Sequence, residues 1–165
     1  MFKLLTRIAF VSFFSLFTTS LFAITKNDVK VIRVIDGDTF IISDNLNHIR
    51  MANIDAPEKK QTYGYQSYLV LKDKLEGRVV TLDILSKDKY GRLISNVYIN
   101  GESINEYMVS KGAAWVYKYY CKDERLYALE YKSKINKIGL WASDKPLPPW
   151  IYRSQINSTI LESKE

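Results

Sequence analysis

The sequence of 165 residues contains one cysteine and one histidine, and both scarcities limit its chemistry. Cys121 has no partner within the chain, which excludes an intrachain disulfide framework and a cysteine-based zinc site. His48 alone disfavours a histidine-rich metal site and a histidine relay. The chemistry of this protein must therefore rest on carboxylates, guanidinium groups, hydroxyls or lysines.

Glycine is scarce as well, and the seven glycines lie at predicted turns and at the ends of predicted elements. Hydrophobic residues make up 47% of the chain and aromatic residues 13%, which supplies the core of one domain and excludes a globally disordered chain. The formal net charge of +6 permits a polyanionic partner but does not demonstrate one.

Residues 1–23 have the pattern of a secretory signal peptide. Lys3 and Arg7 precede an uncharged, phenylalanine-rich stretch, and Ala23 is the kind of small residue that signal peptidase prefers. An uncleaved membrane anchor is the alternative, although the stretch is short for a span, which needs about 20 apolar residues. We expect a secreted or periplasmic protein, cleaved after Ala23, with no membrane contact after cleavage.

The rest of the chain predicts an α+β domain, mainly β, with five strands and three helices. The predicted strands are 28–35, 39–43, 49–54, 79–85 and 93–99. The predicted helices are 65–76, a short helix from 103 to 111, and a last helix from 123 to near 139. A helix after the third of five strands favours a closed five-stranded barrel of the OB type. Within 28–35 the hydrophobic alternation slips by one position, which predicts a bulge.

Residues 143–165 are predicted to be a proline-containing tail. Pro146, Pro148 and Pro149 argue against regular structure there. We expect Trp150 and Tyr152 to dock on the barrel and the last ten residues to be loose.

Two acidic segments flank the predicted second and third strands. Asp36 and Asp38 lie where the first strand turns into the second, and Asp55 lies at the end of the third. Because the second and third strands are antiparallel neighbours, Asp38 and Asp55 are expected to meet at one end of the barrel. Two such carboxylates repel each other unless a cation or a shared proton offsets the repulsion, and a hard divalent ion with oxygen ligands is well suited to this. An ordinary Asp-Gly hairpin turn and a turn cap before Pro57 are the alternatives.

Three further side chains complete a candidate site for phosphodiester cleavage. Glu58 follows Asp55 closely enough to orient or deprotonate an attacking water beside the ion, although a solvated surface glutamate is the alternative. Arg50 lies in an apolar strand and needs an anionic partner, which is either a protein carboxylate or a substrate phosphate. Together with Arg92, it supplies the bidentate guanidinium groups that stabilise a five-coordinate phosphorus.

Five short motifs in this order resemble the thermonuclease family, the staphylococcal-nuclease-like domains. They are VIDGDT at 34–39, IRMANIDAPE at 49–58, DKYGR at 88–92, NE at 105–106 and GLW at 139–141. The resemblance implies an OB barrel with three helices over residues 24–142, without a stable protein partner and most simply a monomer. It also implies a calcium-dependent nuclease that hydrolyses DNA and RNA phosphodiester bonds and leaves 3′-phosphate ends.

The resemblance also implies roles for individual residues by motif position. The implied calcium ligands are Asp38, Asp55 and the backbone carbonyl of Ala56, with Asp36 as a further carboxylate beside them. The implied catalytic residues are Glu58 as general base and Arg50 and Arg92 as the phosphate and transition-state arginines. The implied nucleotide contacts are Lys89, Tyr90 and Tyr120.

Two positions depart from the best-known member of that family. Ala56 and Lys118 stand where that member has threonine and tyrosine, and the loop 59–63 is shorter. We expect the rim of the nucleotide pocket and the substrate preference to be altered and the catalytic residues to be unchanged.

The alternative function is a non-catalytic OB-fold protein that binds single-stranded nucleic acid, and a third possibility is an envelope-tethered structural protein. The preference between DNA and RNA and the role of Cys121 stay open.

Overall fold

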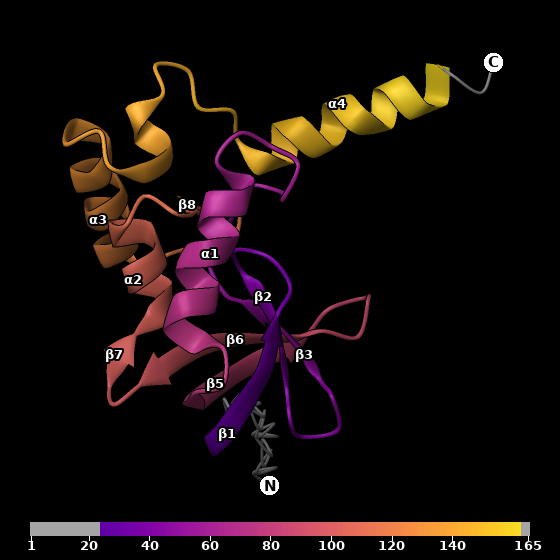
Figure 1. The fold of residues 1–165 in the computed structure, drawn as a ribbon, viewed down its shortest axis with the longest axis vertical. Coiled ribbons are helices and arrows are strands. Elements are labelled where there is room, and N and C mark those ends of the chain that lie inside the picture. Colours follow the sequence, from indigo (N-terminus) through magenta and orange to yellow (C-terminus); the bar gives the residue numbers. More distant parts are fainter. Residues whose placement is uncertain (1–23, 163–165) are drawn as a thin grey trace, which may run out of the picture.

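The computed structural model describes residues 24–162 (Figure 1). The predicted signal peptide, residues 1–23, lies outside the described residues. Among the helices of the described part, none has the length and apolar character needed to cross a membrane.

Five strands close into a barrel, as predicted. They are β1 (Ile24–Val34), β2 (Thr39–Ile42), β3 (His48–Met51), β5 (Val79–Lys87) and β6 (Leu93–Ile99). The strands follow the order β3-β2-β1-β5-β6 with antiparallel neighbours, and a parallel pairing of β3 with β6 closes the ring. This arrangement confirms the α+β fold of the OB type, mainly β. β7 (Glu102–Ser103) extends the sheet beside β6.

The long strand β1 bends because its pairing register slips at two points. Against β2 the slip falls between Val31 and Arg33, which confirms the predicted bulge. Against β5 it falls between Lys26 and Val29, next to Asp28, whose φ of 55° is unusual for a strand. The bent strand pairs with both neighbours around a buried core, whose members include Val31, Phe40, Ile42, Ile49, Leu82 and Val97.

The predicted third strand is interrupted, and the interruption positions Asp55. β3 ends at Met51, Asn53 turns the chain with a φ of 63°, and β4 (Ile54–Asp55) begins directly after it. β4 pairs with β8 (Trp115–Val116) in a separate two-stranded sheet. The buried Asn105 side chain secures the turn, since it donates to the carbonyl of Ala52 at 2.8 Å and accepts from Val97 N at 3.0 Å.

Three helices occur close to where the sequence predicts them. They are α1 (Gly64–Leu75), α2 (Ile104–Ser110) and α3 (Glu124–Ile135), and a 3-10 helix, η1 (Gly139–Ala142), follows α3. Ser103 caps α2 by accepting from Glu106 N, and Asp123 caps α3 by accepting from Arg125 N. α1 buries Leu71 and Leu75 in the core.

The prediction that the tail lacks regular structure is wrong for residues 149–162. They form a fourth helix, α4 (Pro149–Glu162), which extends away from the barrel (Figure 1). Pro149 is the first residue of the helix, where a missing N–H and a fixed φ are tolerated, so it starts the helix instead of preventing it. Trp150 does dock as expected, with its ring centroid 5.7 Å from Trp115 and 5.9 Å from Tyr117.

Candidate active site

The turn between β1 and β2 holds Asp36 and Asp38 at one end of the barrel. Asp38 N donates to Asp36 Oδ1 at 3.0 Å, which fixes the two acids relative to each other. Gly37 is required between them because a Cβ there would lie 2.0 Å from Ser67 Oγ of α1 and 2.6 Å from Ala56 Cβ. The glycine therefore serves the close approach of this turn to α1 and to the segment after β4.

Asp38 is buried and oriented by two donors from different segments. Its Oδ1 accepts from Thr39 Oγ1 at 2.9 Å, and its Oδ2 accepts from Ala56 N at 2.7 Å. The second bond joins the turn after β1 directly to the chain that follows Asp55. The two acidic segments expected to meet therefore lie against each other.

Arg50 bridges the two buried carboxylates. Its Nη2 lies 3.2 Å from Asp38 Oδ2 and 3.0 Å from Asp55 Oδ1, while its Nη1 donates to the carbonyl of Met51 at 2.6 Å. Arg50 is placed in β3 opposite Thr39 of β2, so the pairing of these strands sets its position. Both interpretations of Arg50 required an anionic partner, and protein carboxylates supply one here.

The crowding of carboxylates changes their proton affinity. Burial and the charge of the adjacent Asp38 raise the pKa of the Asp36 carboxyl to about 7. Burial also raises the pKa of Asp55, although the hydrogen bonds from Arg153 and the charge of Arg50 act in the opposite direction. Negative charge is thus disfavoured at this end of the barrel unless cationic groups compensate it.

The segment after β4 presents Glu58 beside the buried pair. Gln61 holds this segment, since its backbone N donates to Glu58 O at 2.7 Å and its side-chain Oε1 accepts from Glu58 N at 3.2 Å. Gly64 allows the segment to lie on the start of α1, because a Cβ there would be 1.7 Å from Glu58 O. The Glu58 side chain is 40% exposed, so water and substrate can reach it.

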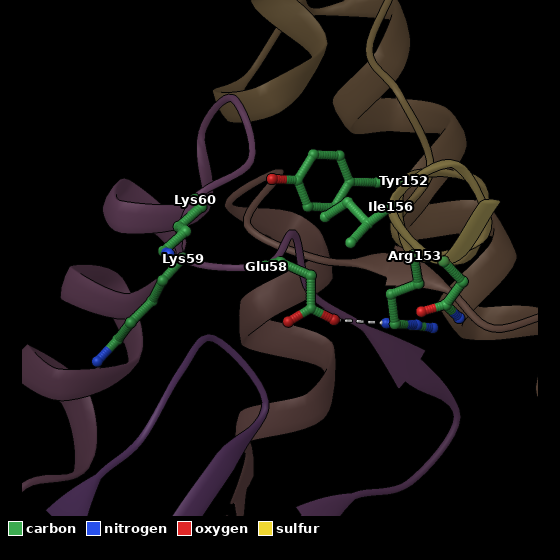
Figure 2. Close-up of a pocket in the computed structure, with 7 residues that line it drawn as sticks. Glu58, Lys59, Lys60, Tyr152, Arg153 and Ile156 are labelled. Atoms are coloured by element: carbon green, nitrogen blue, oxygen red, sulfur yellow. Dashed lines mark hydrogen bonds and ion pairs between the residues drawn. The ribbon is translucent and has the colours of Figure 1, made fainter. Parts of the chain in front are cut away.

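A third arginine enters the site from α4. Arg153 Nη2 lies 2.7 Å from Asp55 Oδ2, and its Nη1 lies 3.2 Å from Asp55 Oδ1 and 2.8 Å from Glu58 Oε1. Figure 2 shows its guanidinium group directed at the Glu58 carboxylate. Arg153 also lines a cavity of about 370 Å³ between α4 and the chain at 58–60, together with Tyr152 and Ile156.

The donor set fits a calcium ion bound by few protein ligands. Asp38 and Asp55 supply hard carboxylate oxygens, and Ala56 adds a backbone carbonyl next in the chain. Across residues 24–162 no three Asp, Glu, His or Cys side chains gather closely enough to hold a metal ion. A calcium ion held by these two carboxylates and one carbonyl would keep coordination positions for water or a phosphate oxygen.

The remaining predicted site residues lie on two other segments. Arg92 precedes β6, whose Leu93 is paired with Ile49 of β3, so its backbone lies one strand away from that of Arg50. Its Nε donates to Asp88 Oδ2 at 2.8 Å, a contact within its own loop. Lys89 and Tyr90 are exposed in this loop.

Tyr120 lies on the connection between β8 and α3, and it is 76% exposed. Its ring centroid is 5.4 Å from that of Tyr117, which in turn contacts Trp150 of α4. Lys118 is exposed in the same connection. This aromatic cluster joins the segment after β8 to the first turn of α4.

Sequence reasoning missed Arg153 and Gln61. Arg153 is the last arginine of the chain and follows a Pro-Pro-Trp run, which could have been recognised as a helix start. No local pattern, however, connects it to carboxylates that lie 98 and 95 residues earlier. Gln61 gives no sequence signal for its role, since a glutamine in a polar loop is ordinarily solvated.

Comparisons with known proteins agree with this geometry. A family profile described as "Staphylococcal nuclease homologue" matches residues 48–143. An uncharacterized endonuclease of Escherichia coli is 44% identical over 127 residues, which cover 75% of this chain and 83% of the relative. A micrococcal nuclease of Shigella flexneri is 33% identical over 137 residues, covering 75% and 79% of the two chains. A staphylococcal-like nuclease of Arabidopsis thaliana is 37% identical over 105 residues, covering 64% of this chain and 32% of the relative.

Proposed function

Because the chain belongs to the staphylococcal nuclease family, we propose that it is a calcium-dependent nuclease that hydrolyses phosphodiester bonds of DNA and RNA and leaves 3′-phosphate ends. The observation that carries this proposal is the pair of buried carboxylates, Asp38 and Asp55, which share one nitrogen of Arg50. Glu58 lies beside them on an accessible segment.

Asp38, Asp55 and the backbone carbonyl of Ala56 would hold the calcium ion. When bound, the ion supplies positive charge that stabilises the negative charge developing on a phosphate oxygen. Thr39 and the Ala56 amide keep the Asp38 carboxylate in one orientation, so the ligand needs little rearrangement. The replacement of threonine by alanine at position 56 preserves the carbonyl ligand.

Glu58 acts as the general base in this proposal. It accepts a proton from a water molecule as the water oxygen attacks phosphorus, and the bond from phosphorus to the 5′ oxygen breaks in line with that attack. The departing oxygen takes a proton from solvent, and the phosphate stays on the 3′ side. Gln61 supports this role because it fixes the backbone of Glu58 on both sides.

Arg50 and Arg92 act on the phosphate group. A guanidinium fork can donate two parallel hydrogen bonds to phosphate oxygens, which stabilises the extra charge of the five-coordinate state. Arg50 is already oriented by Met51 and the two carboxylates. Arg92 needs only to exchange its contact with Asp88, on a half-exposed loop, for a phosphate contact. Lys89, Tyr90 and Tyr120 are the proposed nucleotide contacts around them.

The experiment that tests the proposal measures hydrolysis of DNA and of RNA in calcium, in magnesium and with chelator. We expect cleavage of both polymers in calcium and loss of cleavage with chelator. Products should resist extension by a polymerase until a phosphatase removes the 3′-phosphate. Cleavage that is equal with and without chelator would contradict the calcium mechanism, and tight binding without cleavage would favour the alternative of a non-catalytic binding protein.

Glu58→Gln separates catalysis from binding. A lost general base lowers turnover by about 100- to 10,000-fold, while the affinity for a nucleotide changes little. Glu124→Gln, which removes an exposed acid at the start of α3, is the matched control and should keep full turnover. Equal losses of turnover and affinity in Glu58→Gln would contradict the base role.

Export of the protein is part of the same proposal and rests on the pattern of residues 1–23. N-terminal sequencing of the protein recovered outside the cytoplasm should begin at Ile24. A product that retains residues 1–23 would instead favour the membrane anchor.

A further inference from the structure

Helix α4 carries one cationic side chain into the proposed metal site. Arg153 contacts both carboxylate oxygens of Asp55, one through each terminal nitrogen, and a further contact reaches Glu58 at 2.8 Å. This is the bidentate geometry in which guanidinium groups bind carboxylates most strongly. Asp55 is buried with only 2% of its side chain exposed, so it depends on such cationic partners.

The hydrogen bonds, ion pairs and aromatic contacts that attach the described part of α4 to the rest of the protein lie at its start. Trp150 packs against Trp115 and Tyr117, and the Gln61 side chain donates to the carbonyl of Leu147 just before the helix. Beyond Arg153, the side chains of residues 154–159 are exposed. Figure 1 shows the distal part of α4 extending away from the barrel. The described part of the helix is therefore held by the two aromatic contacts of Trp150, by the hydrogen bond from Gln61 to Leu147 and by the ion pairs of Arg153.

The guanidinium and a metal ion cannot use the same oxygens at once. A cation bound by Asp55 replaces the hydrogen bonds that Arg153 makes and repels its positive charge at short range. The exchange leaves the charge of Asp55 compensated, because the new cation brings its own positive charge. The Arg153 side chain is 42% exposed, so water can solvate its guanidinium group once that group has left Asp55.

We propose that Arg153 is an internal competitor of the calcium ion, so that α4 is docked when calcium is absent and released when calcium binds. This inference rests on the proposed function, because it assumes that Asp55 is a calcium ligand. The docked helix holds Asp55 and Glu58 in ion pairs, which keeps a ligand and the general base from acting. Since only the undocked form can bind calcium, the apparent affinity for calcium is reduced by the fraction of molecules that are undocked.

The test is calorimetric titration of calcium alone into the full chain, without nucleic acid. The proteins are the wild type, Arg153→Gln and the matched control Arg125→Gln. Arg125 is an exposed arginine of α3 that pairs with Glu106, so its replacement removes the same charge far from α4's contact. If docked molecules outnumber undocked ones about tenfold, Arg153→Gln binds calcium about tenfold more tightly than the wild type, and Arg125→Gln changes little.

A second measurement follows the helix itself. An isolated helix of this length is marginal in water, so released α4 should lose protection of its backbone amides. The amides of Ile151 and Tyr152 donate to the carbonyl of Pro148 in the docked first turn. We expect their hydrogen exchange to accelerate when calcium is added to the wild type.

The outcomes separate this inference from the proposed function. Calcium binding with equal affinity in Arg153→Gln and Arg125→Gln, or weaker binding in Arg153→Gln, would overturn the competition while leaving the calcium site intact. Unchanged exchange at Ile151 and Tyr152 in calcium-saturated protein would overturn the release of α4. A lack of calcium binding in all three proteins would overturn the metal site of the proposed function and this inference with it.

Discussion

The two C-terminal helices, α3 and α4, each place a charged side chain against the body of the protein, but in different ways. Glu130 of α3 is 3% exposed, accepts from the backbone N of Val116 at 2.9 Å and pairs with Lys134 at 2.7 Å. Arg153 of α4 contacts only side-chain carboxylates, those of Asp55 and Glu58. The backbone amide of Val116 has no other acceptor available in the core. The carboxylates of Asp55 and Glu58, by contrast, can pair with any cation.

The packing of the two helices differs as well, since α3 is more firmly packed than α4. α3 buries Leu126, Glu130 and Ser133 on one face, and Ser133 Oγ donates to the carbonyl of Val109 in α2 at 3.0 Å. In α4, Trp150 packs against Trp115, and the side chains of residues 154–159 are exposed. α3 is thus held by permanent packing and by a backbone contact, whereas α4 is held by two aromatic contacts and by ion pairs with carboxylates.

Glu130→Ala should break the permanent contact and give the largest effect. The Val116 amide then lacks an acceptor in the core, which lowers the free energy of unfolding by about 2–3 kcal/mol. Urea denaturation measures this loss, and Glu130→Gln should recover part of it because the amide oxygen still accepts. Glu124→Ala, at an exposed position of the same helix, is the control. A loss of less than about 1 kcal/mol in Glu130→Ala would contradict the structural role of Glu130.

Backbone amide exchange should distinguish the two helices in the unaltered protein without calcium. Amides of α3 are expected to open only near the free energy of global unfolding, because the helix buries one face. Amides of residues 154–159 of α4 should open at least about 2 kcal/mol more easily, since the side chains of these residues are exposed. Hydrogen exchange followed by mass spectrometry of the two segments measures the difference. Equal protection would remove the contrast between the helices.

Arg153→Gln should change stability less than either of these effects. The guanidinium is partly solvated, so its loss lowers the free energy of unfolding in chelator by only about 1.4 kcal/mol, the free-energy equivalent of the tenfold docking preference. In saturating calcium the difference from the wild type should disappear, because the helix is then released in both proteins. Paired urea titrations with and without calcium give the result, and a loss as large as that of Glu130→Ala would show that Arg153 is structural.

Cysteine reactivity should also distinguish the start of α3 from α4. Cys121 is buried just before α3, and burial raises the pKa of its thiol, so less reactive thiolate is present near neutral pH. We expect alkylation at pH 8 to be at least about tenfold slower than at a cysteine introduced on α4 by Ser154→Cys, in a Cys121→Ser background. Raising the pH should accelerate both reactions, and denaturant should make the two rates equal. Fast alkylation of native Cys121 would contradict its burial.

Several features of the site follow from local sequence and strand order. Asp38 and Asp55 were expected to meet because adjacent strands bring the start of one and the end of the other together, and both lie within 3.2 Å of one Arg50 nitrogen. The turn that splits the third strand was not expected. The buried Asn105 stabilises this turn, since its side chain donates to the carbonyl of Ala52 from 53 residues further along the chain.

The barrel, the bulge in β1, the positions of α1, α2 and α3 and the convergence of the acidic segments were all predictable from the sequence. Each of these depends on periodicity, on capping residues or on the order of neighbouring strands, which are properties of short stretches. Two features became evident only in the folded protein: Pro149 begins a helix, and Arg153 reaches Asp55 across 98 residues. Such a contact depends on the positions that distant segments take in the folded chain, and no short-range sequence pattern encodes it.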